Sequence, residues 1–197
     1  MKLNIGCGFN KLDGYVNVDM FADCAPDKLW DLNRTPWPFE DDSVDEIVAH
    51  HVLEHLGQDV QVFFAIIREI YRVVRHDGRF KVTVPHPMSM AFHADPTHVR
   101  SFTVTSFSML SRTKNQAWIA EGRNMTMLAL FLDVNFETVQ AVETVDEPWR
   151  TRMRAGELTP AEVRAAAERN IGVIKEIKVE LRVDKTHRRE RAGQPAL

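Results

Sequence analysis

Short apolar runs separated by polar loops give the start of the chain an alternating pattern. Leu3–Ile5 is the first β-type run, and Tyr15–Asp19 is the second, with Val16 and Val18 on one face. Only Gly6–Gly14 lies between these runs, and this segment is shorter than a crossover helix needs. We therefore expect a loop or a single turn to make the first connection.

The next segments predict a strand, a helix and another strand. Val44–Ala49 forms a buried-looking strand after the proline-rich, irregular stretch Ala25–Phe39. Gln58–Val74 is the clearest helix, because its apolar residues recur at the spacing of one helical face. His76–Gly78 predicts a glycine stop for this helix, and Phe80–Val84 predicts a strand that a proline ends. Repetition of strand, helix and strand is typical of a parallel sheet with helices on its faces.

The second half of the chain is less regular. Residues 85–125 show little periodicity and follow a strand end, where α/β folds place ligand-binding loops, so we expect a substrate-side insertion there. Phe136–Val145 and Gly172–Val183 predict two further strands. Thr159–Asn170 predicts a helix with a threonine N-cap and a proline at its first position.

The composition fits one globular domain over residues 1–183, followed by a flexible basic tail over residues 184–197. The 197 residues include 25 Lys and Arg and 28 Asp and Glu, which gives a net charge of −3. No global basic field therefore attracts nucleic acid or an anionic membrane. We find no signal peptide and no apolar stretch that could span a bilayer. Because Cys7 and Cys24 are too few for a disulfide framework, we expect a cytoplasmic protein.

Two features at the ends of the first strands suggest a nucleotide-type cofactor. Gly6 and Gly8 let the backbone turn sharply and approach a ligand, and Asp19 could accept hydrogen bonds from both ribose hydroxyls. Lys11 stands where a dinucleotide fingerprint needs a third glycine, and there is no P-loop motif. These observations favour a cofactor with adenine and ribose but without phosphates, although a tight turn and a strand-end carboxylate also occur in other α/β proteins.

Several segments, taken together, carry a family resemblance. They are Leu3–Gly8, Gly14–Asp19, Asp31–Leu32, Pro36–Phe39, Asp42–Ile47, His51–Leu56, Arg72–Phe80 and Asp95–Arg100. The chain resembles class I S-adenosylmethionine-dependent methyltransferases, and among them a small, type 11-like subgroup with a shortened first crossover. The resemblance covers roughly the first 85 residues. It implies an α/β, Rossmann-like fold with a mostly parallel sheet flanked by helices and an antiparallel C-terminal strand.

The resemblance also implies roles for residues near the first two strands. Gly6, Cys7 and Gly8 would pass along the methionine and ribose part of S-adenosyl-L-methionine. Asp19 would hold the ribose hydroxyls, and Met20 would cover one face of the adenine.

Residues farther along the chain complete the implied cofactor site. Asp31 and Leu32 would sit at the adenine edge, with Asp31 accepting from the exocyclic amine. His50 and His51 would line the methionine moiety near the sulfonium.

A histidine-rich segment after Val84 offers candidates for a general base. We expect His98 to be the base, with Asp95 as its orienting partner, and His86 is the second candidate. The segment from Asp95 to His98 could instead be an Asx-type turn whose side chains cap backbone groups.

The histidines also permit a metal interpretation. His51 and His55 would share one face of a helix, and His86, His93 and His98 with a carboxylate could form another ligand set. The sequence lacks an H-E-x-x-H motif, so we expect no functional metal, and His55 is expected to cap or pack beside Glu54.

The leading hypothesis is a methyltransferase that modifies a hydroxyl on a small or medium-sized acceptor, such as a sugar. A nucleobase, nucleotide or polymer-linked acceptor is an alternative, because four basic residues could form a local phosphate-binding patch: Arg100, Arg112, Lys114 and Arg123. A further alternative is a regulatory module that binds the cofactor without catalysis. The sequence also leaves a homodimer open.

Overall fold

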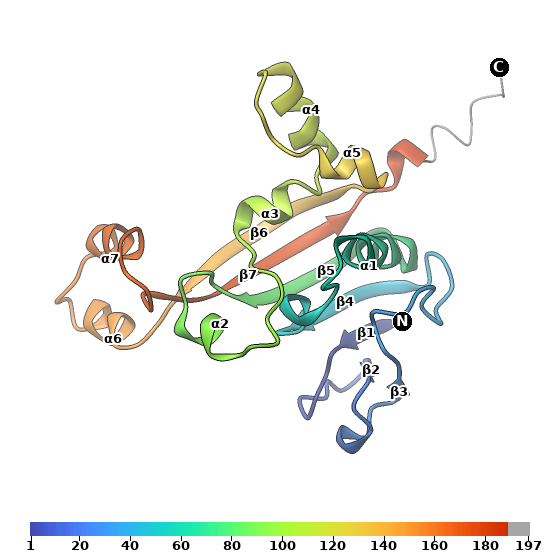
Figure 1. Ribbon diagram of the computed structural model, residues 1–197, viewed down its shortest axis with the longest axis horizontal. Helices are drawn as coiled ribbons and strands as arrows, with labels where there is room; N and C mark the ends of the chain where they lie inside the picture. Colours follow the sequence, from blue (N-terminus) through green and yellow to red (C-terminus); the bar gives the residue numbers. More distant parts are fainter. Residues whose placement is uncertain (189–197) are drawn as a thin grey trace.

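Seven strands form one sheet in the computed structural model, which describes residues 1–188 (Figure 1). The strands are β1 (Lys2–Ile5), β2 (Val16–Asp19), β3 (Lys28–Leu29), β4 (Val44–His50), β5 (Val74–Pro85), β6 (Phe136–Val145) and β7 (Ile174–Val183). Their order is β3-β2-β1-β4-β5-β7-β6, and β7 runs antiparallel to both of its neighbours while the other pairs are parallel. The predicted Rossmann-like fold class, with its antiparallel C-terminal strand, is confirmed.

Seven α-helices and two short 3₁₀ helices connect these strands in the described part. They are η1 (Ala22–Cys24), η2 (Leu53–His55), α1 (Val60–Val73), α2 (Met90–Ala94), α3 (Val104–Ser108), α4 (Arg112–Ala120), α5 (Leu128–Leu132), α6 (Trp149–Arg154) and α7 (Pro160–Ala167). Helix α1 begins after Asp59, whose carboxylate accepts from the Gln61 backbone N–H at 2.6 Å. Helix α7 carries the predicted threonine cap, with Thr159 and Glu162 in a capping box.

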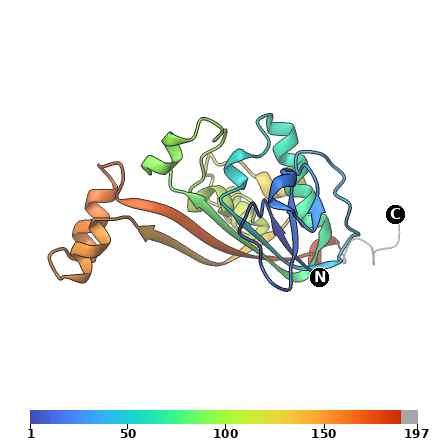
Figure 2. The same ribbon diagram turned by 90° about the horizontal axis from the view of Figure 1, so that it is seen from below.

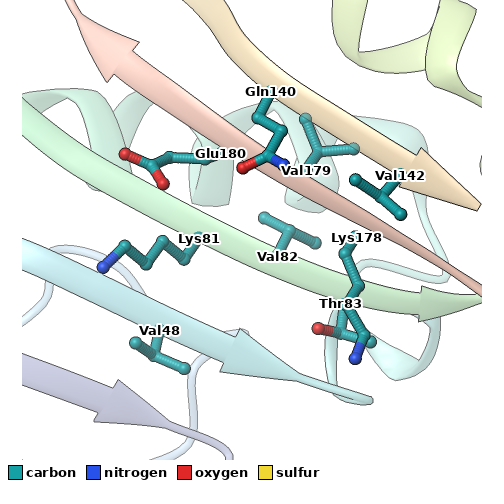
Figure 3. A pocket seen from close by; sticks show the side chains of 9 residues that line it. All are labelled: Val48, Lys81, Val82, Thr83, Gln140, Val142, Lys178, Val179 and Glu180. Carbon is teal, nitrogen blue, oxygen red and sulfur yellow. The ribbon is translucent and has the colours of Figure 1, made fainter.

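The helices of the body lie on one face of the sheet. Figure 2 shows them on one side and bare strands on the other. Along β5, Phe80, Val82 and Val84 are buried beneath the helices, whereas Lys81 and Thr83 point to the opposite face. A shallow hollow of about 320 Å³ lies on that opposite face (Figure 3). The sheet thus buries one apolar face and exposes one polar face.

Ion pairs within and between strands lie along the polar face. Lys81 pairs with Glu46, Lys178 lies 3.2 Å from Glu176, and Arg79 lies 3.6 Å from Glu180. Because charges of opposite sign are paired on this face, it can be exposed to water without a covering layer of helices.

Several local predictions are corrected by the structure. The stretch Ala25–Phe39, expected to be irregular, contains the short strand β3. Helix α1 ends at Val73 and β5 begins at the next residue, so Gly78 is not a helix stop. Residues 75–78 instead form an irregularity in β5, since Val44 pairs with Val74 but Glu46 pairs with Arg79.

The insertion over residues 85–125 is folded rather than an extended loop, because it holds α2, α3 and α4. Beyond it, β6 and β7 extend as a long hairpin whose tip carries α6 and α7, drawn in orange in Figure 1. This arm has its own apolar cluster around Val163, Val173 and Ile174, separate from the main core.

The first residues after β7 pack against the body. The Tyr71 hydroxyl donates to the Asp184 carbonyl at 2.6 Å, and Lys185, which is only 7% exposed, bonds to Asp42. The rest of the expected basic tail, residues 189–197, lies outside the described residues. Within residues 1–188, none of the helices has the length and apolar character needed to cross a bilayer.

Candidate cofactor site

A cavity of about 270 Å³ opens at the carboxyl ends of β1, β2 and β4. Seven residues predicted from the sequence line it: Gly6, Gly8, Asp19, Met20, Asp31, Leu32 and His51. Five further residues complete the lining: Trp30, Asn33, Val52, His55 and Leu56. Ligands of open α/β sheets bind at this edge, where the strand order reverses beside β1.

The glycine bend after β1 shapes one wall of the cavity. Gly6 has φ +62° and Gly8 has φ +49°, which are left-handed conformations that other residues adopt at a cost. A Cβ on Gly6 would lie 2.2 Å from Val52, whereas a Cβ on Gly8 would meet open space. Cys7 does not line the cavity, because its side chain is buried. Burial, followed by the nearby Asp19 charge, raises the pKa of Cys7 to about 11.

Asp19 fixes the bend and still has capacity for a ligand. Its carboxylate accepts from the Gly8 N–H at 2.8 Å and from the Phe21 N–H at 2.9 Å, one at each oxygen. Each oxygen keeps a further lone pair, which suits two ribose hydroxyls. The open space beside Gly8 and the exposed face of Met20 fit an adenosine group in the same cavity.

His51 lies between two buried carboxylates. Its Nε2 is 3.0 Å from Glu176 Oε2, and its Nδ1 is 3.4 Å from Glu54 Oε1. These carboxylates, Glu54 foremost, raise the pKa of His51. Lys178 lies 3.2 Å from the other oxygen of Glu176, so His51 and Lys178 together balance the two carboxylates. His50 does not line the cavity, because it is exposed at the end of β4 and packs edge-on against His51.

The predicted base and its partner are not joined as expected. Asp95 Oδ1 accepts from the Thr97 backbone N–H at 2.8 Å and from the Thr97 hydroxyl at 2.6 Å, and these bonds lower the pKa of Asp95. This is the Asx-type turn that the sequence left open. The His98 Nδ1 lies 2.8 Å from the Phe92 carbonyl instead, so Asp95 does not orient His98 through a hydrogen bond.

The residue that Asp95 does position is His55. The Thr97 hydroxyl, which donates to Asp95, lies 2.8 Å from His55 Nδ1, and His55 and His98 pack edge to face at 4.6 Å. His51 and His55 do not share a helix face, since His51 has φ +53° and His55 ends the short helix η2. His55 lines the cofactor cavity, whereas His98 does not.

His86 is placed away from the cavity and is already engaged. Its Nδ1 accepts from the Met88 N–H at 3.1 Å, and burial lowers the pKa of its ring. In the neutral ring the remaining nitrogen then carries the proton, so His86 is poorly prepared to accept another.

A second hollow adjoins the cofactor cavity. It measures about 520 Å³, and Asn33 and His55 line both spaces. Thr97 and Val99 form part of its wall, from the histidine-rich segment after β5.

The strand order, the glycine bend and the strand-end carboxylate define the class I S-adenosylmethionine-dependent methyltransferase fold. Residues 26–82 match the family model described as a methyltransferase domain. The match covers less than half of the chain, and together with the fold it shows a methyltransferase-type, Rossmann-like architecture. Among curated proteins, none matches the sequence.

Solved structures agree with this fold. The YcgJ protein from Bacillus subtilis is 15% identical with a TM-score of 0.55, and the alignment covers 93% of this chain and 91% of that one. A SAM-dependent methyltransferase from Archaeoglobus fulgidus is 17% identical with a TM-score of 0.54, covering 92% and 85%. The N-methyltransferase NodS from Bradyrhizobium japonicum is 12% identical with a TM-score of 0.53, covering 93% and 85%.

The position of His55 at the cavity was not predicted from the sequence. His55 was expected to cap or pack beside Glu54, or in the metal interpretation to share a helix face with His51. The contact with Thr97 spans 42 positions of the chain, and no local pattern reports it.

Proposed function

We propose that the chain methylates a hydroxyl group of a small or medium-sized acceptor that occupies the hollow beside the cofactor cavity. S-adenosylmethionine supplies an activated methyl group when bound. The observation that carries the proposal is His55, which stands where the two spaces meet. A hydroxyl must lose a proton on methylation, and a basic nitrogen at this junction is placed to receive it.

The hydrogen bonds of His55 support a role as a base. The Thr97 hydroxyl gives its proton to Asp95, so its oxygen accepts from His55 Nδ1–H. This arrangement fixes the ring tautomer and leaves a lone pair on Nε2. Asp95, Thr97 and His55 thus form a chain in which Asp95 is a positioning residue.

The nucleic-acid alternative receives less support from the basic residues. Arg112 lies 3.2 Å from Asp133 and Arg123 lies 2.6 Å from Glu121, so both are paired. Arg100 packs over the Phe63 ring at 4.2 Å and donates to the Gly57 carbonyl. Three of the four expected basic residues are therefore already engaged, which leaves Lys114 as the remaining member of the expected patch.

The test is methyl transfer to a panel of acceptors, with hydroxyl, amine and thiol members matched in size. We expect a product heavier by one methylene whose fragmentation places the methyl group on oxygen. Exclusive methylation of nitrogen or sulfur would overturn the proposed acceptor class. Turnover of no acceptor, with cofactor binding intact, would favour the non-catalytic module.

A variant series tests the role of His55. His55→Gln should lower kcat by about 10²-fold or more, a larger factor than its change in the Kd of S-adenosylhomocysteine. His93→Gln is the matched control, because His93 is an exposed histidine of α2 that lines neither space. Equal kcat in the His55 variant and the control would exclude His55 as the base.

A further inference from the structure

We propose that Glu54, His55 and His98 form a binding site for one divalent, zinc-type metal ion at the edge of the cofactor cavity. One ligand atom from each of these residues lies within 4.8 Å of the other two. The residues come from η2 and from the segment after α2, and the Val99 N–H ties these segments by donating to the Glu54 carbonyl at 2.9 Å. The ligand group is therefore assembled by the fold rather than by a local motif.

Both imidazoles are prepared to offer a lone pair. His55 Nδ1 donates to the Thr97 hydroxyl. His98 Nδ1 lies 2.8 Å from the Phe92 carbonyl, and because a carbonyl oxygen can only accept, this nitrogen is the donor. In each neutral ring the unprotonated nitrogen is then Nε2, which has no hydrogen-bond partner within residues 1–188. Hydrogen bonds of this kind orient histidine ligands of metals.

Glu54 supplies the independent observation that points to a cation. Its side chain is 1% exposed, and among the described residues neither carboxylate oxygen has a hydrogen-bond partner. Its ion-pair partner is His51, whose Nδ1 lies 3.4 Å from Oε1 and whose Nε2 is engaged by Glu176. A buried carboxylate that accepts no hydrogen bond and shares one imidazole with a second carboxylate is costly, and a bound metal ion would offset that cost.

The donor set fits a zinc-type ion better than magnesium or calcium. Two imidazole nitrogens and one carboxylate oxygen match the ligands that Zn²⁺ takes in sites with an open fourth position. Binding does not depend on the proposed function. A metal ion would occupy the His55 Nε2 lone pair that the proposed base uses, so the metal-free chain is the form in which His55 acts as the base.

A second group of metal-ligating residues lies nearby but is already engaged. Cys7, Asp19 and Cys24 also place ligand atoms within 4.8 Å of one another. Asp19 accepts from two backbone N–H groups, and Cys24 Sγ lies 2.9 Å from the Phe21 carbonyl. We assign no ion to this group, and the experiment separates the two sites.

The test uses the full chain without a histidine tag, stripped with a chelator and then titrated with Zn²⁺ in competition with a chromophoric chelator. We expect one Zn²⁺ per chain. Glu54→Gln and His98→Ala should each weaken Zn²⁺ binding by more than about 100-fold, and Thr97→Val, which removes an orienting bond, by about 10- to 100-fold. His93→Ala is the control and should bind Zn²⁺ as the parent does.

Titration with Co²⁺ reports the ligand type. We expect visible bands of nitrogen and oxygen coordination, no thiolate charge-transfer band, and unchanged binding after joint replacement of Cys7 and Cys24 by serine. Absence of tight binding, binding that survives both Glu54→Gln and His98→Ala, or binding lost in the cysteine variant would overturn the site. Product analysis with the acceptor panel is a separate measurement, so failure of the metal site and failure of O-methylation are distinguishable.

Discussion

Asp19 joins the end of β2 to the glycine bend after β1 through a single carboxylate. It closes β2, accepts from the Gly8 and Phe21 N–H groups, and lines the cavity. The sequence indicated its position at a strand end, but the two backbone bonds are a tertiary feature. Because both carboxylate oxygens already have one donor each, the bend is held in place before a ligand arrives.

Asp19→Asn should weaken S-adenosylhomocysteine binding by about 1.5–3 kcal/mol, which is roughly 10- to 150-fold in Kd. The amide keeps the side-chain size but replaces one acceptor oxygen with a donor. Isothermal calorimetry measures the change, with Asp23→Asn as the control because Asp23 is exposed on η1 and does not line the cavity. An unchanged Kd would remove Asp19 from the cofactor site.

Cys7 should be chemically inert despite its place between two glycines. With a pKa of about 11, its thiol is almost fully protonated at pH 8, and only the thiolate reacts with alkylating agents. In a Cys24→Ala variant, iodoacetamide should label Cys7 far more slowly in the folded chain than in urea, as mass spectrometry can follow. Equal labelling rates would contradict the burial of this thiol.

At the scale of elements, the first bend and the segment after β4 are packed as one unit. Gly6 ends β1 against Val52, which precedes η2, and a Cβ at Gly6 would lie 2.2 Å from the Val52 side chain. Gly14 has a similar φ of +78° but faces open space. Gly6 is therefore needed both for its backbone conformation and for packing, whereas Gly14 is needed for its backbone conformation alone.

Gly6→Ala should destabilise the protein more than Gly14→Ala does. Both variants place alanine in a left-handed conformation, at about 1–2 kcal/mol, but only Gly6→Ala adds overpacking, at about 1–3 kcal/mol. Urea unfolding measures both changes in the free energy of unfolding. Adding Val52→Ala should relieve part of the loss in the Gly6 variant alone, and equal losses in the two single variants would refute the packing argument.

For the whole molecule, the distribution of apolar residues explains a sheet covered on one face. Apolar residues of the central strands alternate toward α1, α3 and α5, while charged residues alternate toward water, where Lys81 and Arg79 pair with residues of the neighbouring strands. The tip of the β6–β7 hairpin, with α6 and α7, carries a separate small apolar cluster at the far end of the hairpin (Figure 1). Residues 146–173 of this tip do not line the cofactor cavity, whereas Glu176 near the start of β7 contacts His51.

Replacing residues 146–173 by a two-residue Asn-Gly turn should leave cofactor binding intact. The deletion removes the arm cluster and one bond from the Gly172 N–H to the Met88 carbonyl, while Val145 and Ile174 already pair at the base of the hairpin. We expect a shift in Tm of less than about 4 °C, the size of roughly 1 kcal/mol in a small domain. Loss of S-adenosylhomocysteine binding in calorimetry would show instead that residues 146–173 are needed to keep the cavity in shape.

Local chemistry determined the strands, the main helix and the cofactor side of the site. Periodicity and capping act within a few residues, and the glycines with Asp19 lie close in sequence, so these features are visible in the chain itself. The acceptor side was different. Only the tertiary structure decided that Asp95 is connected to His55 through the Thr97 hydroxyl, and that Glu54 lies near His98. Packing between loops that are distant in sequence sets these contacts.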